Sequence, residues 1–345
     1  MGGSAEGGDA MAFALTAGVA SQVERVCLDS RDLARHARAH ALRMVHRAKA
    51  SHIGAALSMI DILAVLYADT MRVRPEAPGW PERDRLIVSK GHGAVGLYAI
   101  LGELGFFPRE ELDTYGTDGA RLMGHVSHRV PGVELSTGSL GHGLPVAGGL
   151  ALGLPASRVF CVLGDGELDE GSNWEAAMFA AHHRLGNLTA IVDHNRIQSL
   201  GRVEDVLSLG SIAAKFAAFG WRTVEVDGHD HDALRDALSG EGAPWSEERA
   251  EGGTVGGSAE GRDARLLDAS FGVVPQVEGV PKGDAKTFGI ESAGNAFQVH
   301  RIRPLCIVAH TVKGKGVDFM EDSLAWHYKS PDDAQLAEAL RQVGA

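Results

Sequence analysis

Near its midpoint the chain reads Val159-Phe160-Cys161-Val162-Leu163-Gly164-Asp165-Gly166-Glu167. The run that ends at Leu163 is almost wholly apolar, which is typical of a strand buried on both faces of a parallel sheet. Such a strand delivers Asp165 to its carboxyl end, and the flanking glycines let backbone come close to a ligand. The stretch therefore predicts a strand that ends in an acidic, glycine-lined binding loop.

A second strand supplies the partner of that loop. Leu188 to Asp193 is again apolar, and Asn195 follows it, thirty positions beyond Asp165. Mg²⁺ prefers hard oxygen ligands in octahedral geometry, shared with phosphate oxygens. We therefore predict that the side chains of Asp165 and Asn195 and the Ile197 carbonyl bind Mg²⁺, with Ca²⁺ or Mn²⁺ as substitutes. A lone Gly-Asp-Gly is usually only a turn, but the two strands, the helix between them and the placed Asn favour a binding site.

The remaining periodicity predicts an α/β domain. Apolar residues spaced for one helical face follow Ser30, which we interpret as an N-cap, and Ser58 with Asp61 resembles a capping box before another apolar helix. Further expected elements are a strand over 85–89, a helix over 173–184, and strands over 158–163, 188–193, 221–226 and 305–310. Strands this apolar predict a mostly parallel sheet with helices on both faces, a three-layer fold.

Two segments fall outside this pattern. Residues 1–29 are expected to form an N-terminal tail, and residues 30–345 a single domain. Within that domain, residues 241–302 are rich in Gly, Ala, Glu and Ser and show little apolar periodicity, which indicates a low-complexity insertion. We assign neither segment a function.

Composition excludes several classes of protein. The chain has 345 residues, 44% of them hydrophobic, and a formal net charge of −12, which argues against a nucleic-acid surface. We expect no signal peptide and no membrane span. Three cysteines far apart in sequence indicate neither a disulfide framework nor a zinc site, so we expect a cytoplasmic protein.

Beyond these physical arguments, the chain resembles the thiamine diphosphate-dependent enzymes, and most closely the amino-terminal subunit of a split transketolase. The resemblance rests on Gly164-Asp165-Gly166 with Asn195 and on six further blocks in the family's order. These blocks are Ser51-His52-Ile53-Gly54, Arg83-Asp84-Arg85, Ser89-Lys90-Gly91-His92-Gly93, Ser136-Thr137-Gly138-Ser139-Leu140-Gly141-His142-Gly143, Asp227-Gly228-His229-Asp230 and His310-Thr311-Val312-Lys313-Gly314-Lys315-Gly316.

The resemblance implies cofactors, an activity and site residues. The cofactors are thiamine diphosphate and Mg²⁺, and the activity is transfer of a two-carbon ketol unit from a ketose or ketose phosphate to an aldehyde acceptor. Catalytic roles are implied for His52, His92, His125 and His327, with His128 as an alternative to His125. Cofactor contacts are implied for His92, Gly141, His142, Gly143, Gly164, Asp165, Gly166, Glu167 and Asn195, and Glu170 is placed in an acidic cluster near a subunit interface.

Two positions depart from the family pattern. Ile53 stands where the family usually has Pro, and His142 where it has Gln. An imidazole can donate, accept or carry charge, which an amide cannot, so the preference for donor or acceptor sugar stays open.

The resemblance also implies a missing half. Relatives place a pyrimidine-binding domain after this one, so the expected partner is a separate C-terminal transketolase subunit, with activity only in a heterotetramer of the two chains. Three alternatives remain: the alpha chain of a 2-oxo acid dehydrogenase, a relative that passes the two-carbon unit to a non-sugar or lipoyl carrier acceptor, and a non-catalytic scaffold.

Overall fold

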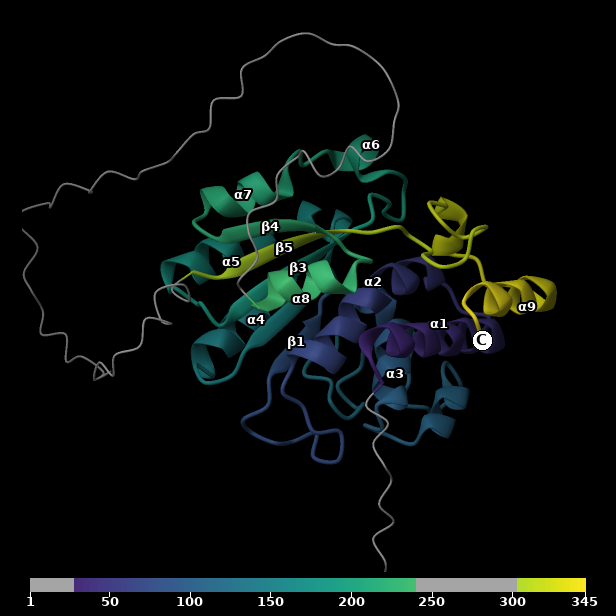
Figure 1. Cartoon of the computed structure of the whole chain (residues 1–345). Helices are drawn as coiled ribbons and strands as arrows, with labels where there is room; N and C mark the ends of the chain where they lie inside the picture. Colours follow the sequence, from purple (N-terminus) through teal and green to yellow (C-terminus); the bar gives the residue numbers. More distant parts are fainter. Residues whose placement is uncertain (1–27, 240–302) are drawn as a thin grey trace, which may run out of the picture.

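A five-stranded parallel sheet forms the centre of the protein (Figure 1). The computed structural model describes residues 28–239 and 303–345. The strand order is β1-β2-β3-β5-β4, with bounds β1 Arg85–Val88, β2 Val159–Gly164, β3 Leu188–His194, β4 Arg222–Asp227 and β5 Leu305–His310. The parallel sheet predicted from the apolar runs is confirmed.

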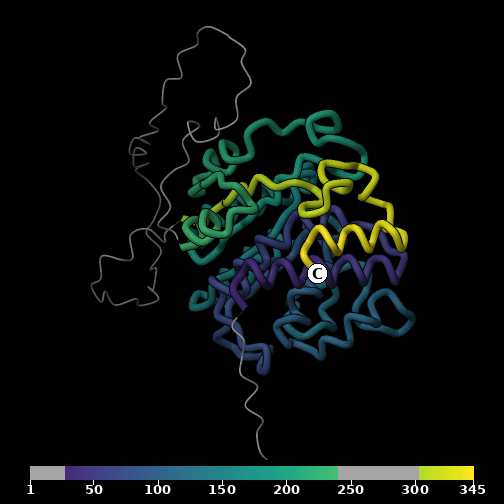
Figure 2. The backbone as a smooth tube through the Cα atoms, turned by 45° about the vertical axis from the view of Figure 1, so that its right-hand side comes forward, coloured from purple at the N-terminus to yellow at the C-terminus, as the bar shows by residue number. Residues whose placement is uncertain are grey.

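Helices cover both faces of the sheet and give the predicted three layers (Figures 1 and 2). One face is covered by a layer of α1 (Ser30–Ala48), α2 (Ile53–Val65), α3 (Ala94–Glu103) and α8 (His231–Ser239), with α9 (Asp333–Gln342) packed on α1. The other packs against α4 (Gly143–Gly153), α5 (Gly171–His182) and α7 (Ile212–Ala218). Alternate strand residues enter the two cores: Phe160 and Val162 join the first, Cys161 and Leu163 the second.

Short helical turns connect these elements. They are η1 (Leu66–Thr70), η2 (Gly91–Gly93), η3 (Arg109–Thr114), η4 (Gly166–Asp169), α6 (Val203–Leu207) and η7 (Leu324–His327). The last helix, α9, lies beside the first, α1, so both ends of the described chain belong to one layer (Figure 2). The predictions for residues 1–27, including Cys27, and for the insertion at 241–302 lie outside the described residues.

Two expected helix starts are wrong. The N-cap of α1 is Asp29, whose Oδ1 accepts from the Asp32 N–H at 2.8 Å, because the Ser30 hydroxyl contacts His231 Nδ1 instead. Helix α2 begins at Ile53, so Ser58 and Asp61 are interior residues and form no capping box. Both side chains are buried and point to polar partners elsewhere in the fold.

The stretch Ile53–Thr70 is long and apolar enough to cross a membrane by length and composition alone. However, 83% of it is buried inside the protein. Its apolar character is therefore explained by its place in the core between the sheet and helices α1 and α3.

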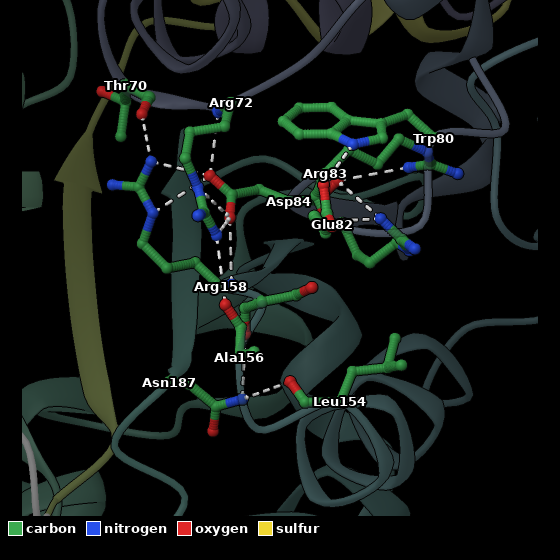
Figure 3. Close-up of polar contacts among 12 residues, drawn as sticks. Thr70, Arg72, Trp80, Glu82, Arg83, Asp84, Leu154, Ala156, Arg158 and Asn187 are labelled. Carbon is green, nitrogen blue, oxygen red and sulfur yellow. Dashed lines mark hydrogen bonds and ion pairs between the residues drawn. The ribbon is translucent and has the colours of Figure 1, made fainter. Parts of the chain in front are cut away.

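A buried carboxylate fastens the amino ends of β1 and β2 (Figure 3). Asp84 is fully buried and accepts from the backbone N–H and guanidinium of both Arg72 and Arg158. Arg72 also donates to the Ala156 carbonyl, and Arg158 to that of Thr70. This network joins η1, β1 and β2 at the end of the sheet opposite the Gly-Asp-Gly loop.

We expect Asp84→Asn to lower the free energy of unfolding by about 2–4 kcal/mol, because it leaves two guanidinium groups without their shared anion. Burial opposes ionisation, but the hydrogen bonds from Arg72 and Arg158 hold the pKa of Asp84 below its ordinary value of 3.8. The stabilisation is therefore complete above about pH 4 and is lost as the pH falls through the lowered pKa of the folded state. Urea unfolding of wild type and variant at pH 7 and pH 3 tests this.

The exposed Glu110→Gln serves as the control, since it changes charge without touching the network. A constant difference between wild type and Asp84→Asn at both pH values would contradict this account of Asp84.

Candidate active site

A cavity of about 270 Å³ opens at the carboxyl ends of β1, β2 and β3. This is the edge of a parallel sheet at which ligands bind in open α/β folds. The cavity is lined by His52, Ala55, Lys90, His92, His125, Gly138, Leu140, Gly164, Asp165, Gly166, Glu167, Asn195, Ile197, Gln198, Ser199, Lys313, His327 and Tyr328. Segments far apart in the sequence therefore meet in one site.

One end of the cavity presents hard oxygen atoms. Asp165 directly follows β2, and its carboxylate accepts hydrogen bonds from the backbone N–H groups of Gly166 (2.8 Å) and Arg196. Asn195 Oδ1 accepts from the Ile197 N–H at 3.1 Å, and the Ile197 carbonyl accepts from Lys313 Nζ at 2.9 Å. Arg196 adopts a left-handed conformation (φ 64°), which turns the chain sharply between Asn195 and Ile197.

The Asp165 carboxylate is electrostatically unsatisfied. Its side chain is buried, and burial together with the nearby Asp193 raises its pKa to about 6, against the two backbone hydrogen bonds. A carboxylate in this state gains from a bound cation.

Two buried lysines lie beside these oxygens. Lys90, at the end of β1, forms an ion pair with Asp193, and Lys313 donates to Ile197. Lys313 is 1% exposed, and burial and Lys90 lower its pKa to about 8. Two cations at the closed end of a cavity are suited to a phosphate-bearing ligand.

Four imidazoles line the other part of the cavity. The ring of His52 lies 5.4 Å from His92, 5.7 Å from His125 and 5.1 Å from His327, between ring centroids. The backbone of His52 adopts a left-handed conformation (φ 72°), and its backbone N–H donates to the His327 backbone carbonyl at 2.8 Å. This contact couples the start of α2 to η7, two elements that the sequence separates by some 270 positions.

Three of these imidazoles, those of His52, His92 and His327, are held neutral. Burial, with nearby positive groups, lowers the pKa of His52 to about 4 and that of His327 to about 3, and that of His92 falls well below its ordinary value. Lys313 Nζ lies 2.9 Å from His327 Nδ1. Since an ammonium only donates, His327 Nδ1 is the acceptor and its Nε2 bears the proton.

The glycine block Gly141-His142-Gly143 packs beside the Gly-Asp-Gly loop. A Cβ on Gly143 would lie 2.3 Å from Ser89 Cβ, so no side chain fits there. Glu167 accepts from the Gly141 N–H (2.9 Å), the Gly164 N–H (3.2 Å) and the Ser89 hydroxyl. Burial raises the pKa of Glu167. The block is thereby fixed against the Gly-Asp-Gly loop.

The residues present fit a metal-bound diphosphate. Asp165, Asn195 and the Ile197 carbonyl offer the oxygen set that Mg²⁺ prefers, and Lys90 and Lys313 provide positive charge for phosphate. Within residues 28–239 and 303–345, no three His, Cys, Asp or Glu side chains are grouped to hold a metal ion. A metal at this site would therefore depend on the amide, the carbonyl and the ligand's own oxygens.

Most of the predicted site residues come together. The cavity is lined by His52, His92, His125, His327, Gly164, Asp165, Gly166, Glu167, Asn195 and Ile197. Gly141, His142 and Gly143 do not line it; His142 is exposed and contacts the Leu140 carbonyl at 3.0 Å. His128 is bonded to Ser136 and does not line the cavity, whereas His125 does. The roles of these residues stay predictions.

Sequence reasoning missed Lys90, Lys313, Asp193 and Tyr328. Both lysines stand inside quoted blocks, each next to a glycine after a strand, which is the signal that was available. The sequence marks Asp193 only as the end of a strand, and nothing in it marks Tyr328, which lines the cavity and is 63% exposed.

Comparison with known proteins places the chain among characterised families. Residues 29–244 match the family model described as transketolase, thiamine diphosphate binding domain. The chain is 35% identical over 306 residues to an apulose-4-phosphate transketolase subunit of Phocaeicola vulgatus, covering 88% of this chain and 89% of that protein. It is 43% identical over 192 residues to a 6-deoxy-6-sulfo-D-fructose transketolase subunit of Clostridium sp., covering 54% and 70%.

The fold also matches solved structures. Transketolase from Leishmania mexicana superposes with a TM-score of 0.70 at 25% identity, over 92% of this chain. The match covers only 41% of the longer Leishmania chain.

Removal of the Asp165 charge should change the pH dependence of stability in the chelator-treated chain. Because its pKa is raised from 3.8 to about 6, the folded state binds more protons than the unfolded state between these values, and stability falls as the pH rises through them. At pH 8, ionisation of the buried Asp165 carboxylate lowers the free energy of unfolding of wild type by about 3 kcal/mol, and Asp165→Asn avoids this loss. The substitution also removes one backbone hydrogen bond, which is worth about 1 kcal/mol.

We therefore expect Asp165→Asn to be more stable than wild type at pH 8, about equal to it near pH 4.5 and less stable at about pH 3.5, in thermal or urea unfolding with a chelator present. The absence of such a crossover would show that the Asp165 carboxylate is not strained by its burial.

Proposed function

Because the chain belongs to the transketolase family through its thiamine diphosphate binding domain, we propose that it is the cofactor-binding half of a two-chain transketolase. In this proposal it transfers a two-carbon ketol unit from a ketose or ketose phosphate to an aldehyde, in complex with a second subunit. The main support is a single cavity that joins an end lined by the Asp165 carboxylate, Asn195 and Ile197, with two lysines, to four imidazoles, three of them with lowered pKa values.

The closed end would hold the cofactor's diphosphate. Asp165, Asn195 and the Ile197 carbonyl would bind Mg²⁺, while Lys90 and Lys313 would offset the phosphate charge. When bound, thiamine diphosphate supplies the reactive ring for breaking and making carbon–carbon bonds. The chain itself supplies binding, orientation and proton handling.

The imidazole cluster suits proton movement at sugar hydroxyls. The neutral ring of His52 can accept a proton from a donor hydroxyl. His327 presents its Nε2–H as a donor, because Lys313 occupies its Nδ1. Cleavage of a ketose needs a hydroxyl to lose its proton, and transfer to an aldehyde needs an oxygen to gain one, so both functions are available in one cavity.

Two observations support a partner subunit: the names of the relatives, and an exposed apolar surface on α4 and α5. Relatives are named as transketolase subunits, and this chain spans 41% of the Leishmania transketolase chain. Helix α4 contains no charged residue, yet its Val146 and Leu152 are 38% and 50% exposed. On the adjacent α5, Met178 and Phe179 are 50% and 38% exposed, and Phe179 lies over Gly148 of α4. An apolar helix with an exposed face is typical of an interface.

The two relatives named above differ in the sugar their names specify, so we propose the substrate as a class. The direct test is reconstitution. The tagged chain is isolated from its source cells with Mg²⁺ and thiamine diphosphate, its partner is identified by mass, and the purified pair is assayed with a panel of ketoses and ketose phosphates. Ketol transfer by the pair and none by the chain alone is the expected result.

Other outcomes of that assay favour the alternatives. Turnover of pyruvate would indicate a 2-oxo acid dehydrogenase component, and transfer only to a lipoyl carrier would indicate a carrier-dependent relative. A pair that binds no thiamine diphosphate would contradict the proposal and favour a scaffold.

We expect Asp165→Asn to abolish Mg²⁺-dependent thiamine diphosphate binding by the pair, because it removes the one charged metal ligand. In contrast, His92→Ala should change the dissociation constant less than about tenfold and lower kcat by about 100-fold or more, since it removes a group proposed to move protons. Isothermal titration and steady-state kinetics measure both. Normal cofactor affinity in Asp165→Asn would refute the proposed metal site.

Met178→Asp should weaken binding of the partner by about 100-fold or more, because it places a charge on the proposed interface without disturbing the core. Leu207→Asp is the matched control: Leu207 is 52% exposed but lies on α6. Analytical ultracentrifugation of the purified pair gives the dissociation constants. Equal affinities of the two variants would place the interface elsewhere.

A further inference from the structure

The block Asp227-Gly228-His229-Asp230 lies outside the cavity, yet its geometry points to a role in the site. Its first residue, Asp227, ends β4, and the residues after it approach the loop that follows β5. A Cβ on Gly228 would lie 2.4 Å from Thr311 Cγ2, so this approach requires glycine. The Gly228 N–H donates to the His310 carbonyl at 2.7 Å.

His229 connects a buried carboxylate to that loop. Its Nδ1 lies 2.6 Å from Asp61 Oδ2, and its Nε2 lies 2.8 Å from the Val312 backbone nitrogen. A backbone N–H only donates, so Nε2 is the acceptor. The remaining ring proton is therefore on Nδ1 and is donated to Asp61.

Asp61 is a hub of four polar contacts. Each of its oxygens accepts from one Arg38 guanidinium nitrogen (2.9 and 2.5 Å) and one imidazole, His229 at Oδ2 and His231 at Oδ1 (3.1 Å). Arg38 in turn donates from Nε to the Lys315 carbonyl at 3.2 Å. Asp61 thus reaches the loop by two routes, through His229 to Val312 and through Arg38 to Lys315.

These two anchors stand on either side of Lys313. The same loop is also fixed by the Thr311 hydroxyl on Asp193 and by the Gly314 N–H on the Gly54 carbonyl at 2.9 Å. The Lys313 side chain lines the cavity, where its ammonium contacts the Ile197 carbonyl and His327 Nδ1, each at 2.9 Å.

We propose that His229 is a positioning residue: backed by Asp61, it anchors the Val312 N–H and, together with Arg38, fixes the Lys313 ammonium between Ile197 and His327. The expected effect on cofactor affinity rests on the proposed function, whereas the hydrogen bond from the Val312 N–H to His229 is independent of it. His231 provides the internal comparison, because it also bonds Asp61 but ends at the Ser30 hydroxyl (2.9 Å) and does not touch the loop.

Three variants separate positioning from general stability. His229→Asn keeps an amide donor near the place of Nδ1, for Asp61, but removes the acceptor for Val312. His229→Gln places its amide oxygen near Nε2 and keeps that acceptor. His231→Ala removes one Asp61 contact and leaves the loop anchored.

The first readouts need no cofactor. In the full-length chain, we expect His229→Asn to speed amide hydrogen exchange at Val312 and acylation of Lys313 by roughly tenfold or more, the factor that corresponds to one lost buried hydrogen bond. His229→Gln should restore both rates to within about threefold of wild type, and His231→Ala should leave both unchanged even where it lowers the unfolding midpoint. Mass spectrometry of peptides measures both rates.

An unchanged Lys313 acylation rate in folded His229→Asn overturns the proposal, as does an equal effect of His231→Ala. The third readout is the dissociation constant of Mg²⁺–thiamine diphosphate for the reconstituted pair, expected to rise roughly tenfold in His229→Asn and to be restored in His229→Gln. Should the wild-type pair bind no cofactor, the proposed function fails, and the two cofactor-free rates still decide the role of His229.

Discussion

The site depends on one buried ion pair, between Lys90 and Asp193. Asp193 is near the carboxyl end of β3, the central strand, and is fully buried. Burial opposes its ionisation, but Lys90 and the hydroxyls of Ser58 and Thr311 hold its pKa below the ordinary value. An uncompensated charge at this depth would cost several kcal/mol, so the segments after β1 and β5 and the middle of α2 are held together where the cavity forms.

Two further buried carboxylates repeat this arrangement at other places. Asp84 joins the amino ends of β1 and β2 through two arginines, away from the cavity (Figure 3). Asp61 joins α1, α2 and α8 to the loop that bears Lys313. Asp165 differs from all three, because its pKa is raised and no cation pairs with it among the described residues. Glu167 also has a raised pKa, but its carboxylate accepts three hydrogen bonds that fix the neighbouring glycine block, so we propose Asp165 as the carboxylate that holds a metal.

The sequence was sufficient for the sheet and most of the cavity, and insufficient for the contacts between loops. Apolar runs such as 188–193 predicted the strands because a strand buried on both faces must be apolar, and Asp165 and Asn195 followed from their position after strands. The start of α2 was placed wrongly because Ser58 and Asp61 mimic a capping box, whereas their side chains bond to partners across the core. Pairings such as Ser58 with Asp193 and His229 with Asp61 span more than a hundred positions, and no local pattern encodes them.

The most direct test is a crystal structure of the reconstituted pair grown with thiamine diphosphate and Mn²⁺ in place of Mg²⁺, with the metal located by anomalous scattering. The account predicts one strong peak in this chain, bound by Asp165, Asn195 and the Ile197 carbonyl and by the diphosphate, with the imidazoles of His52, His92 and His327 facing the cofactor. A diphosphate bound without a metal at Asp165, or a metal held elsewhere, would contradict it.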